Sequence, residues 1–466
     1  MKFVYFILFI LALASCNTNN TVKITGTITN PDGDVITLNV PFKTSRDTIA
    51  TIQEDGTFKA ELEITKPYMA TIINGDAFVK LNLVPGSVLN ISFDGTELKS
   101  GKTENVTIEG EGSESSILLL ELRNIQPEEN IKALLAYPAP EFDSKVTSHI
   151  QTITDKIDEF ESSNPGYESL TEILRLEQKV ALAQYYNYFV MYHARFAPND
   201  TLPVPEEFKT FVDAIATDNY DAFELSRQYK GFVVDQTMSA IDDKLTQDGV
   251  AEGSIAYTSK LFDAVVAMEV PQIVKDEMGN RMLGSYTYEP DSIKEVMKTR
   301  YTEIIKNEEY TNEFKALLAK LEKLQPGAVA PTFAYNDING NQVTSEDLKG
   351  KVIYIDVWAT WCGPCKGEIP YLKAMEEELH DSDIAFVSIS VDNDKSAWEK
   401  MVADKELRGY QLFAPNAWDS EIIQNYAIRG IPRFIMIDKE GKLVNANATR
   451  PSNPETKDKL IELANS

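Results

Sequence analysis

The sequence predicts a multidomain protein with an antiparallel β-sandwich at the N-terminus, an all-α domain in the middle and an α/β domain at the C-terminus. Three hydrophobic patterns lead to this prediction. Apolar and polar residues first alternate, then apolar residues recur every three or four positions, and finally continuous apolar runs alternate with helical segments. A chain of 466 residues can form several domains, each with its own core. We place the domains at 21–112, 113–324 and 325–466, after a leader at 1–15 and a tether at 16–20.

The leader has the pattern of an export signal. Residues 1–15 combine one positive charge with an apolar run that is too short for a permanent membrane span. The run ends in Leu-Ala-Ser directly before Cys16, which resembles a bacterial lipobox. This resemblance implies that the signal peptide is cut before Cys16, that lipid is attached to its sulfur, and that the acyl chains hold the protein on a membrane. An ordinary secretory signal with an incidental cysteine is the alternative.

The charge of the chain limits its partners. A net charge of −27 argues against binding to nucleic acid, and also against lying flat on an anionic lipid surface. We therefore expect no nucleic-acid partner, and we expect membrane attachment through the lipid anchor alone.

The segment 21–112 has the two-residue period of half-buried strands. Apolar residues from Phe58 to Ile64 alternate with charged ones, and Gly-containing turns such as Asp55-Gly56 separate such runs. Short strands at this spacing favour an antiparallel sandwich. The segment contains no catalytic cluster, so we interpret it as a spacer or docking module, with an independent binding site as the alternative.

The segment 113–324 has a helical period. Apolar residues spaced for one helix face run from Leu170 to Tyr192 and from Tyr301 to Leu324. We expect several antiparallel helices here. The stretch from Gly279 to Pro290 interrupts the period and is predicted to be a loop.

The C-terminal domain contains the chemistry. A continuous apolar run, expected to be a central strand, leads into Cys362-Gly363-Pro364-Cys365 at the start of a predicted helix. Unpaired N–H groups at a helix start favour a thiolate, so Cys362 is the expected nucleophile, with Cys365 shielded one turn inside. A zinc site would need a second pair of ligands, which the sequence does not offer, so no metal and no cofactor are expected.

The residues around this motif resemble a known family. Residues 357–365, Val-Trp-Ala-Thr-Trp-Cys-Gly-Pro-Cys, are similar to the active site of the thioredoxin superfamily. The segments 330–333, 337–340 and 348–351 resemble the entry of the extracytoplasmic TlpA/ResA-like branch, whose entry motif is AhpC/TSA-like. The resemblance covers about residues 325–466 and implies a thioredoxin-like fold with a redox-active disulfide between Cys362 and Cys365. The β domain resembles one of unknown function that precedes such domains in lipoproteins.

The same resemblance implies a substrate-binding surface. Gly430-Ile431-Pro432, before a predicted strand, matches the cis-proline loop of the superfamily, in which the Ile431 backbone would pair with the substrate and Pro432 would contact the sulfurs. Trp361 is expected to form an apolar rim beside the nucleophile. The predicted substrate-binding residues are Trp361, Gly363, Pro364, Ile431 and Pro432.

Two acids complete the predicted site. Asp356 matches the buried acid of thioredoxins, and Glu368 matches the acid of the ResA-like branch. Burial raises the pKa of a carboxyl, so either acid is a candidate to take the proton of Cys365 during catalysis. The alternative is that an acid merely pairs with Lys366, Lys351 or a backbone group.

We therefore expect an extracytoplasmic thiol–disulfide oxidoreductase that faces the periplasm from the inner or outer membrane. It would reduce disulfides of exported proteins through its Cys-Gly-Pro-Cys pair. By resemblance, a membrane protein of the DsbD/CcdA type would return it to the dithiol form. Two alternatives stay open. One is a surface or assembly lipoprotein whose front domains bind a partner, and the other is a peroxiredoxin.

Overall fold

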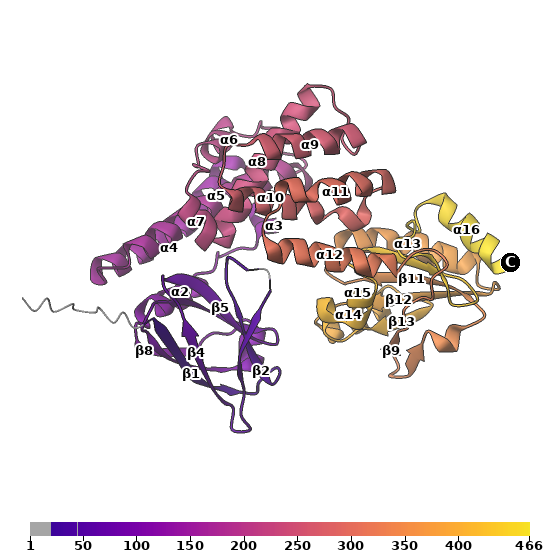
Figure 1. Cartoon of the computed structure of the whole chain (residues 1–466), viewed down its shortest axis with the longest axis horizontal. Coiled ribbons are helices and arrows are strands. Elements are labelled where there is room, and N and C mark those ends of the chain that lie inside the picture. Colours follow the sequence, from indigo (N-terminus) through magenta and orange to yellow (C-terminus); the bar gives the residue numbers. More distant parts are fainter. Residues whose placement is uncertain (1–19, 44) are drawn as a thin grey trace, which may run out of the picture. The chain divides into compact units, whose positions relative to one another are not determined.

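The computed structural model describes residues 20–43 and 45–466, which form two compact units, Met1–Ala240 and Ile241–Ser466 (Figure 1). The predicted leader and the predicted lipidation site Cys16 lie outside the described residues. In the described part of the chain, no helix is both long enough and apolar enough to cross a membrane.

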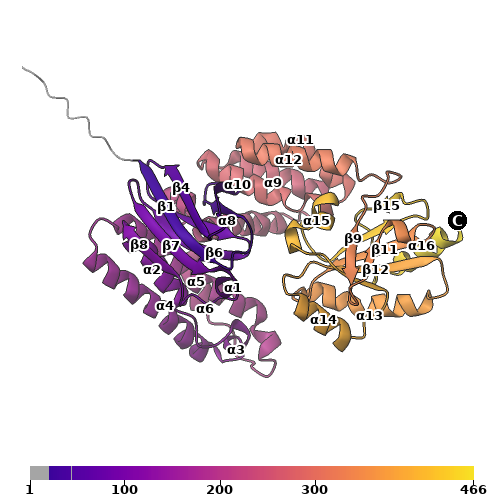
Figure 2. The same cartoon turned by 90° about the horizontal axis from the view of Figure 1, so that it is seen from below.

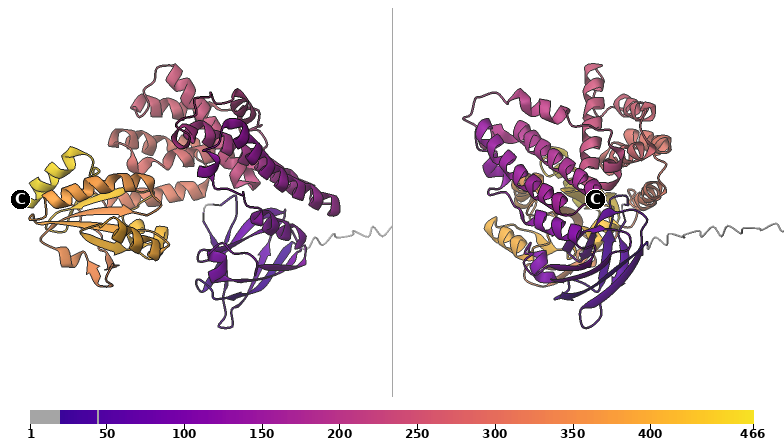
Figure 3. Two further views of the ribbon diagram at one scale, coloured as in Figure 1. Left: turned by 180° about the vertical axis from the view of Figure 1, so that it is seen from behind. Right: turned by 90° about the vertical axis from the view of Figure 1, so that its left-hand side faces the viewer.

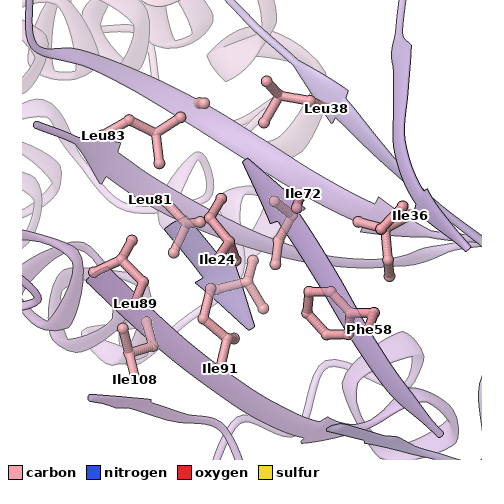
Figure 4. Packing of buried hydrophobic residues seen from close by; sticks show 14 of the residues in the cluster. Ile24, Ile36, Leu38, Phe58, Ile72, Leu81, Leu83, Leu89, Ile91 and Ile108 are labelled. Atoms are coloured by element: carbon pink, nitrogen blue, oxygen red, sulfur yellow. The ribbon is translucent and has the colours of Figure 1, made fainter. Parts of the chain in front are cut away.

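The first unit begins with two four-stranded sheets that share one core. Side chains of Ile24, Leu89 and Ile91 from one sheet and of Ile72 and Leu81 from the other lie together in this core (Figure 4). The sheet orders are β4-β1-β7-β8 and β3-β2-β5-β6. Their bounds are β1 Thr21–Thr29, β2 Val35–Asn39, β3 Asp47–Thr51, β4 Thr57–Glu63, β5 Tyr68–Asn74, β6 Ala77–Leu83, β7 Val88–Asp94 and β8 Thr107–Glu111, with the short helix α1 at Gly95–Lys99.

The prediction of a wholly antiparallel sandwich is wrong at one pair of strands. β1 pairs with β4 in antiparallel fashion but with β7 in parallel, with Ile24 opposite Leu89. Alternation along a strand determines which face is buried, and this alternation is the same for both directions of pairing. The sequence pattern therefore indicated the buried positions but not the direction of the neighbouring strand.

A helical stretch follows the sheets. α4 and α5 pack against each other through Phe142 and Phe189, whose ring centroids are 4.6 Å apart. α9 to α12 belong to the second unit and lie together there (Figure 2). The helices are α2 Glu114–Asn124, α3 Ile131–Leu134, α4 Ala139–Ser163, α5 Glu168–Phe196, α6 Glu206–Asp213, α7 Tyr220–Leu225, α8 Arg227–Gln247, α9 Ile255–Ala267, α10 Gln272–Leu283, α11 Asp291–Ile304 and α12 Glu308–Glu322.

The prediction of a loop from Gly279 to Pro290 is also wrong. α10 continues through Gly279 to Leu283, and the 3-10 helix η1 follows at Tyr286–Tyr288. Glycine weakens a helix, but here it permits close packing, because a Cβ at Gly279 would lie 2.5 Å from a side-chain carbon of Ile305. Tertiary packing therefore overrides the local signal.

The C-terminal region is a seven-stranded sheet of order β10-β9-β13-β12-β11-β14-β15, with helices against both faces (Figure 3, left). β11 is buried along its whole length, parallel to β12 and antiparallel to β14. From the sequence we expected the order β-α-β-α-β-β-α after an N-terminal extension, which omits one helix, α14, and one strand, β13. The elements are β9 Ala334–Asp337, β10 Gln342–Thr344, η2 Glu346–Leu348, β11 Val352–Trp358, α13 Gly363–Glu378, β12 Ile384–Ser390, α14 Lys395–Asp404, β13 Tyr410–Phe413, η3 Ala417–Asp419, α15 Glu421–Asn425, β14 Arg433–Ile437, β15 Leu443–Asn445 and α16 Pro454–Asn465.

One face of α13 determines what surrounds the cysteine motif. Leu372 and Met375 pack in one cluster with Val352 and Tyr354 of β11. Alternation along β11 places Asp356 on the same face as Val352 and Tyr354, toward α13. The buried positions of α13 recur at helical spacing and are Cys365, Glu368, Leu372, Met375 and Glu376.

Candidate active site

Cys362 and Cys365 form a disulfide at the carboxyl end of β11, with their Cα atoms 5.3 Å apart. Cys362 is the N-cap residue of α13, and its Sγ accepts a hydrogen bond of 3.1 Å from the backbone N–H of Cys365. The start of a helix is favourable for negative charge, and a hydrogen bond to sulfur favours the thiolate further. This position suits Cys362 as the nucleophile.

The two cysteines are equally buried in the disulfide form. Their exposed fractions are 4% for Cys362 and 3% for Cys365. The expected greater exposure of Cys362 is therefore not present in this redox state. The neighbours of Cys362 are exposed, with Trp361 at 58% and both Gly363 and Pro364 at the surface. These neighbours, and not the sulfurs, are therefore the accessible part of the motif.

A buried carboxylate fixes the segment before the cysteines. Asp392 accepts hydrogen bonds from the N–H and the hydroxyl of Thr360 and from the hydroxyl of Ser390, at 2.7 to 3.1 Å. These bonds connect the end of β11 to the end of β12. They position the motif and were not predicted from the sequence.

A second exposed tryptophan lies beside the predicted rim. Trp418 of η3 is 38% exposed, and its ring centroid is 6.4 Å from that of Trp361. The sequence analysis did not place Trp418 in the site. Trp418 follows β13, which ends at the same edge of the sheet as β11, and this strand was not identified from the sequence.

The loop before β14 has the predicted form. The peptide bond between Ile431 and Pro432 is cis, which confirms that prediction. β14 pairs directly with β11, so this loop lies beside the strand that leads to the cysteines. Among the hydrogen bonds of the described residues, none involves the backbone of Ile431. Its N–H and C=O therefore remain available for an extended chain.

Asp356 is buried without a partner for one of its oxygens. The side chain is 8% exposed, and within residues 20–43 and 45–466 its Oδ1 has no hydrogen bond. Burial, together with the nearby charges of Glu368 and Glu376, raises the pKa of Asp356 to about 8. Burial next to other carboxylates disfavours the charged form, so Asp356 holds a proton at neutral pH. Burial, together with the nearby charges of Asp356 and Glu368, raises the pKa of the Tyr354 hydroxyl, which donates to the Thr449 carbonyl.

Glu368 lies in a different environment. Its carboxylate accepts hydrogen bonds of 3.0 Å from both the N–H and the hydroxyl of Ser452, and Arg450 lies 3.7 Å away. The alternative of ordinary pairing therefore describes Glu368, although its partners are not the lysines considered above. Asp356 has no comparable pairing.

The sequence analysis missed a third buried acid, Glu376. It lies on the same buried face of α13, and burial raises its pKa to about 7, against the opposing charges of Arg408 and Lys373. Its neighbours Glu377 and Glu378 are exposed, so this run of acids looked like a solvated surface. The helical spacing from Glu368 was the signal that would have separated Glu376 from them. No group of residues that could bind a metal ion occurs in the part of the chain that the structure describes.

Comparison with known proteins shows which family the C-terminal region belongs to. Residues 325–460 match the Redoxin family. The thiol-disulfide oxidoreductase ResA of a Bacillus cereus strain is 32% identical over 133 residues, which are 28% of this chain and 74% of the relative. The chain belongs to the ResA family of thiol-disulfide oxidoreductases. ResA of Bacillus subtilis (strain 168) is 29% identical over 133 residues, covering 28% of this chain and 72% of that protein.

Two solved structures cover the same ResA-like domain. The thioredoxin domain of a thiol-disulfide oxidoreductase from Bacteroides vulgatus is 27% identical and covers 30% of this chain and 99% of its own, with a TM-score of 0.28. A thiol:disulfide interchange protein from a Bacteroides species is 27% identical and covers 31% of this chain and 93% of its own, also with a TM-score of 0.28. The residues that match the Redoxin family and ResA lie in the C-terminal region, where the enzyme is a thioredoxin-like thiol-disulfide oxidoreductase.

Proposed function

We propose that the protein reduces disulfides of exported proteins outside the cytoplasm through a dithiol mechanism at Cys362 and Cys365. The observation that carries this proposal is the position of Cys362 at the N-terminus of α13, where its sulfur accepts the N–H of Cys365. The open backbone of Ile431 and the exposed rings of Trp361 and Trp418 fit an extended polypeptide substrate.

The mechanism begins from the reduced pair. The Cys362 thiolate attacks one sulfur of the client disulfide, a bond forms between Cys362 Sγ and that sulfur, and the other client sulfur leaves as a thiolate and takes up a proton. Cys365 then gives its proton to a base, and its thiolate attacks Cys362 Sγ. The mixed disulfide breaks, and the client leaves with its second thiol. The client gains two electrons, and the enzyme ends as the disulfide.

Asp356 is the base that we assign to Cys365. The acid lies on the strand face toward α13, the helix whose buried face carries Cys365. A pKa of about 8 makes its carboxylate a better base than an ordinary aspartate, and a proton accepted there can later return to a leaving sulfur. Glu368 and Glu376 raise that pKa through their charges. Because the pKa of Asp356 depends on these neighbouring charges, pH profiles will report apparent values and not the pKa of Asp356 alone.

The location and the supply of electrons are further parts of the proposal. We place the protein in the cell envelope, facing the periplasm, with its anchor on Cys16. A membrane donor of the DsbD/CcdA type would reduce the Cys362–Cys365 disulfide after each cycle. We assign the redox domain to 325–466, and we interpret the segments 21–112 and 113–324 as parts that dock or space it, although the helices of 113–324 divide between the two compact units.

The test is insulin reduction by the full chain with dithiothreitol as the source of electrons. We expect the wild-type protein to accelerate precipitation of the insulin B chain, and Cys362→Ser to reduce the rate to background because a hydroxyl cannot replace the thiolate. Equal rates for the two proteins would refute the proposal. Cys16→Ala tests location separately, because only the lipidated wild type should remain in the membrane fraction.

A further inference from the structure

The 3-10 helix η1 of the helical stretch contacts the loop at which a client would bind. The hydroxyl of Tyr288 donates a hydrogen bond of 2.7 Å to the carbonyl of Gly430, the residue before Ile431. A Cβ on Gly430 would lie 2.8 Å from that hydroxyl oxygen, so the glycine and the tyrosine fit each other closely. Both residues belong to the second unit, within which these contacts lie.

Arg433, the residue after Pro432, also contacts η1. Arg433 is 3% exposed, and its guanidinium carbon lies 4.5 Å from the centre of the Tyr288 ring. It also donates to Thr287 Oγ1 at 3.3 Å. Among the ion pairs of the described residues, none involves Arg433; its guanidinium instead lies against the Tyr288 ring and also donates to the carbonyl of Ala446 at 3.5 Å. Its Nε has no hydrogen-bond partner in the described structure. The amide of Asn447 donates to the Thr287 carbonyl at 3.3 Å and connects η1 to the segment after β15.

These contacts fix both ends of the tripeptide 430–432. Tyr288 holds the carbonyl at its start, and the contacts of the Arg433 side chain with Tyr288 and Thr287 hold the residue that follows its end. Between them, the backbone of Ile431 has no hydrogen bond in the described structure. Tyr288 remains 42% exposed, so part of its ring also faces outward next to this free backbone.

We propose that Tyr288 is a positioning residue for client recognition: its hydroxyl orients the Gly430–Ile431 backbone for pairing with a client chain, and its exposed ring edge contacts that chain. The helical stretch thereby contributes to substrate binding by the redox domain. This inference rests on the proposed reduction of protein disulfides. It applies only to polypeptide substrates, because a small disulfide reaches Cys362 without pairing along the Ile431 backbone.

The experiment compares two substrates across variants of the full chain. The substrates are insulin and the small aromatic disulfide 5,5′-dithiobis(2-nitrobenzoate). Tyr288→Phe removes only the hydroxyl and keeps the ring over Arg433. Losing one hydrogen bond should raise the KM for insulin about fivefold. The kcat for insulin and the rate with the small disulfide should not change. Tyr288→Ala should raise the KM for insulin further, because the ring contact is lost as well.

A matched control is Tyr188→Phe, which removes the hydroxyl of another half-exposed tyrosine, on α5, 45% exposed. The Tyr188→Phe variant should reduce insulin and the small disulfide with the same kinetics as the wild type. A second control is thermal unfolding of the Tyr288→Phe variant, which should be unchanged if the fold is intact. An unchanged KM for insulin, a faster reaction, or an equal loss with both substrates would overturn the inference. A wild-type protein that does not reduce insulin would instead overturn the proposed function and this inference together.

Discussion

Two buried polar side chains, Asn82 of the first unit and Asp356 of the second, lie in opposite environments. In the first unit, Asn82 is 2% exposed and its side chain donates to the hydroxyl of Ser115, while the hydroxyl of Ser116 accepts from its backbone N–H at 3.0 Å. In the second unit, Asp356 is buried with an oxygen that has no partner in the described structure. Satisfied buried groups fix one arrangement of a core, whereas an unsatisfied one is costly and is retained where it has a chemical role.

Asn74 supports the same contrast. It is fully buried in the first unit, where it accepts the N–H of Asp32 and donates to the carbonyls of Gly33 and Val35. These bonds join a turn to the end of β5, which is a structural role. The comparison therefore predicts that substitutions in the first unit change stability, and that substitution of Asp356 changes catalysis and changes stability in the opposite direction.

The largest expected effect is on the resolution step. Asp356→Asn removes the base that takes the Cys365 proton, and loss of a general base slows a step by about a hundredfold or more. In the wild type, the rate should rise with pH up to about 8, as the carboxylate with its raised pKa forms. In the variant this rise should disappear. Stopped-flow release of a client thiol from the mixed disulfide measures both effects. An unchanged rate and profile would remove Asp356 from the mechanism.

The second effect is on the free energy of unfolding, with opposite signs in the two units. The pKa of Asp356 is about 8 in the folded protein and about 3.9 in an unfolded chain, so the folded state holds the extra proton between these values. The free energy of unfolding of the wild type therefore falls as pH rises from about 4 to about 8. The Asp356→Asn variant has no carboxyl at this position, so its free energy of unfolding does not fall in this way as pH rises. It should be more stable than the wild type by a few kcal/mol at pH 9, and the difference should shrink toward pH 4.

Asn82→Ala is the counterpart in the first unit. It leaves the hydroxyl of Ser115 without its partner and should cost on the order of 1–3 kcal/mol, with no dependence on pH in this range. Urea denaturation at pH 4, 7 and 9 compares the two variants. A destabilised Asp356→Asn protein at pH 9 would mean that the acid has a structural partner, and the contrast between the units would fail.

The smallest effects concern the acids that act through Asp356. Glu368→Gln should shift the midpoint of the resolution profile to lower pH by less than about one unit, because it removes a charge that raises the pKa of Asp356. Glu376→Gln should shift it in the same direction by less, since its charge contributes less to that pKa. A shift to higher pH in either variant would mean that the removed charge does not raise the pKa of Asp356.

The sequence predicted what depends on local pattern. The turn from a buried strand into a helix located Cys362 and Cys365, whereas the cis bond at Pro432 followed from the resemblance of Gly430-Ile431-Pro432 to the cis-proline loop of the superfamily. Asp356 stood out because an acid inside an apolar strand is costly. α14 was missed although Asp394 caps it by accepting the N–H groups of Ser396 and Ala397, a local signal that was present.

Other features depend on contacts between distant segments. Trp418 lies next to Trp361 only because β13 and β11 end at the same edge of the sheet, and Tyr288 meets Gly430 across a separation of 142 residues. The two partners of such a contact are not neighbours in the sequence, and neither has a periodic pattern that identifies it. The direction of β1 relative to β7 belongs to the same class, since pairing is decided by the fold of the whole domain.

The central claim is that Cys362 attacks a client disulfide and Cys365 resolves the product. Trapping with the full-length Cys365→Ser protein tests it most directly. After incubation with oxidised insulin, mass spectrometry of the non-reduced, digested adduct should show a client cysteine joined to Cys362, and dithiothreitol should release it. An adduct that survives Cys362→Ser in the same background, or no adduct at Cys362, would contradict the account.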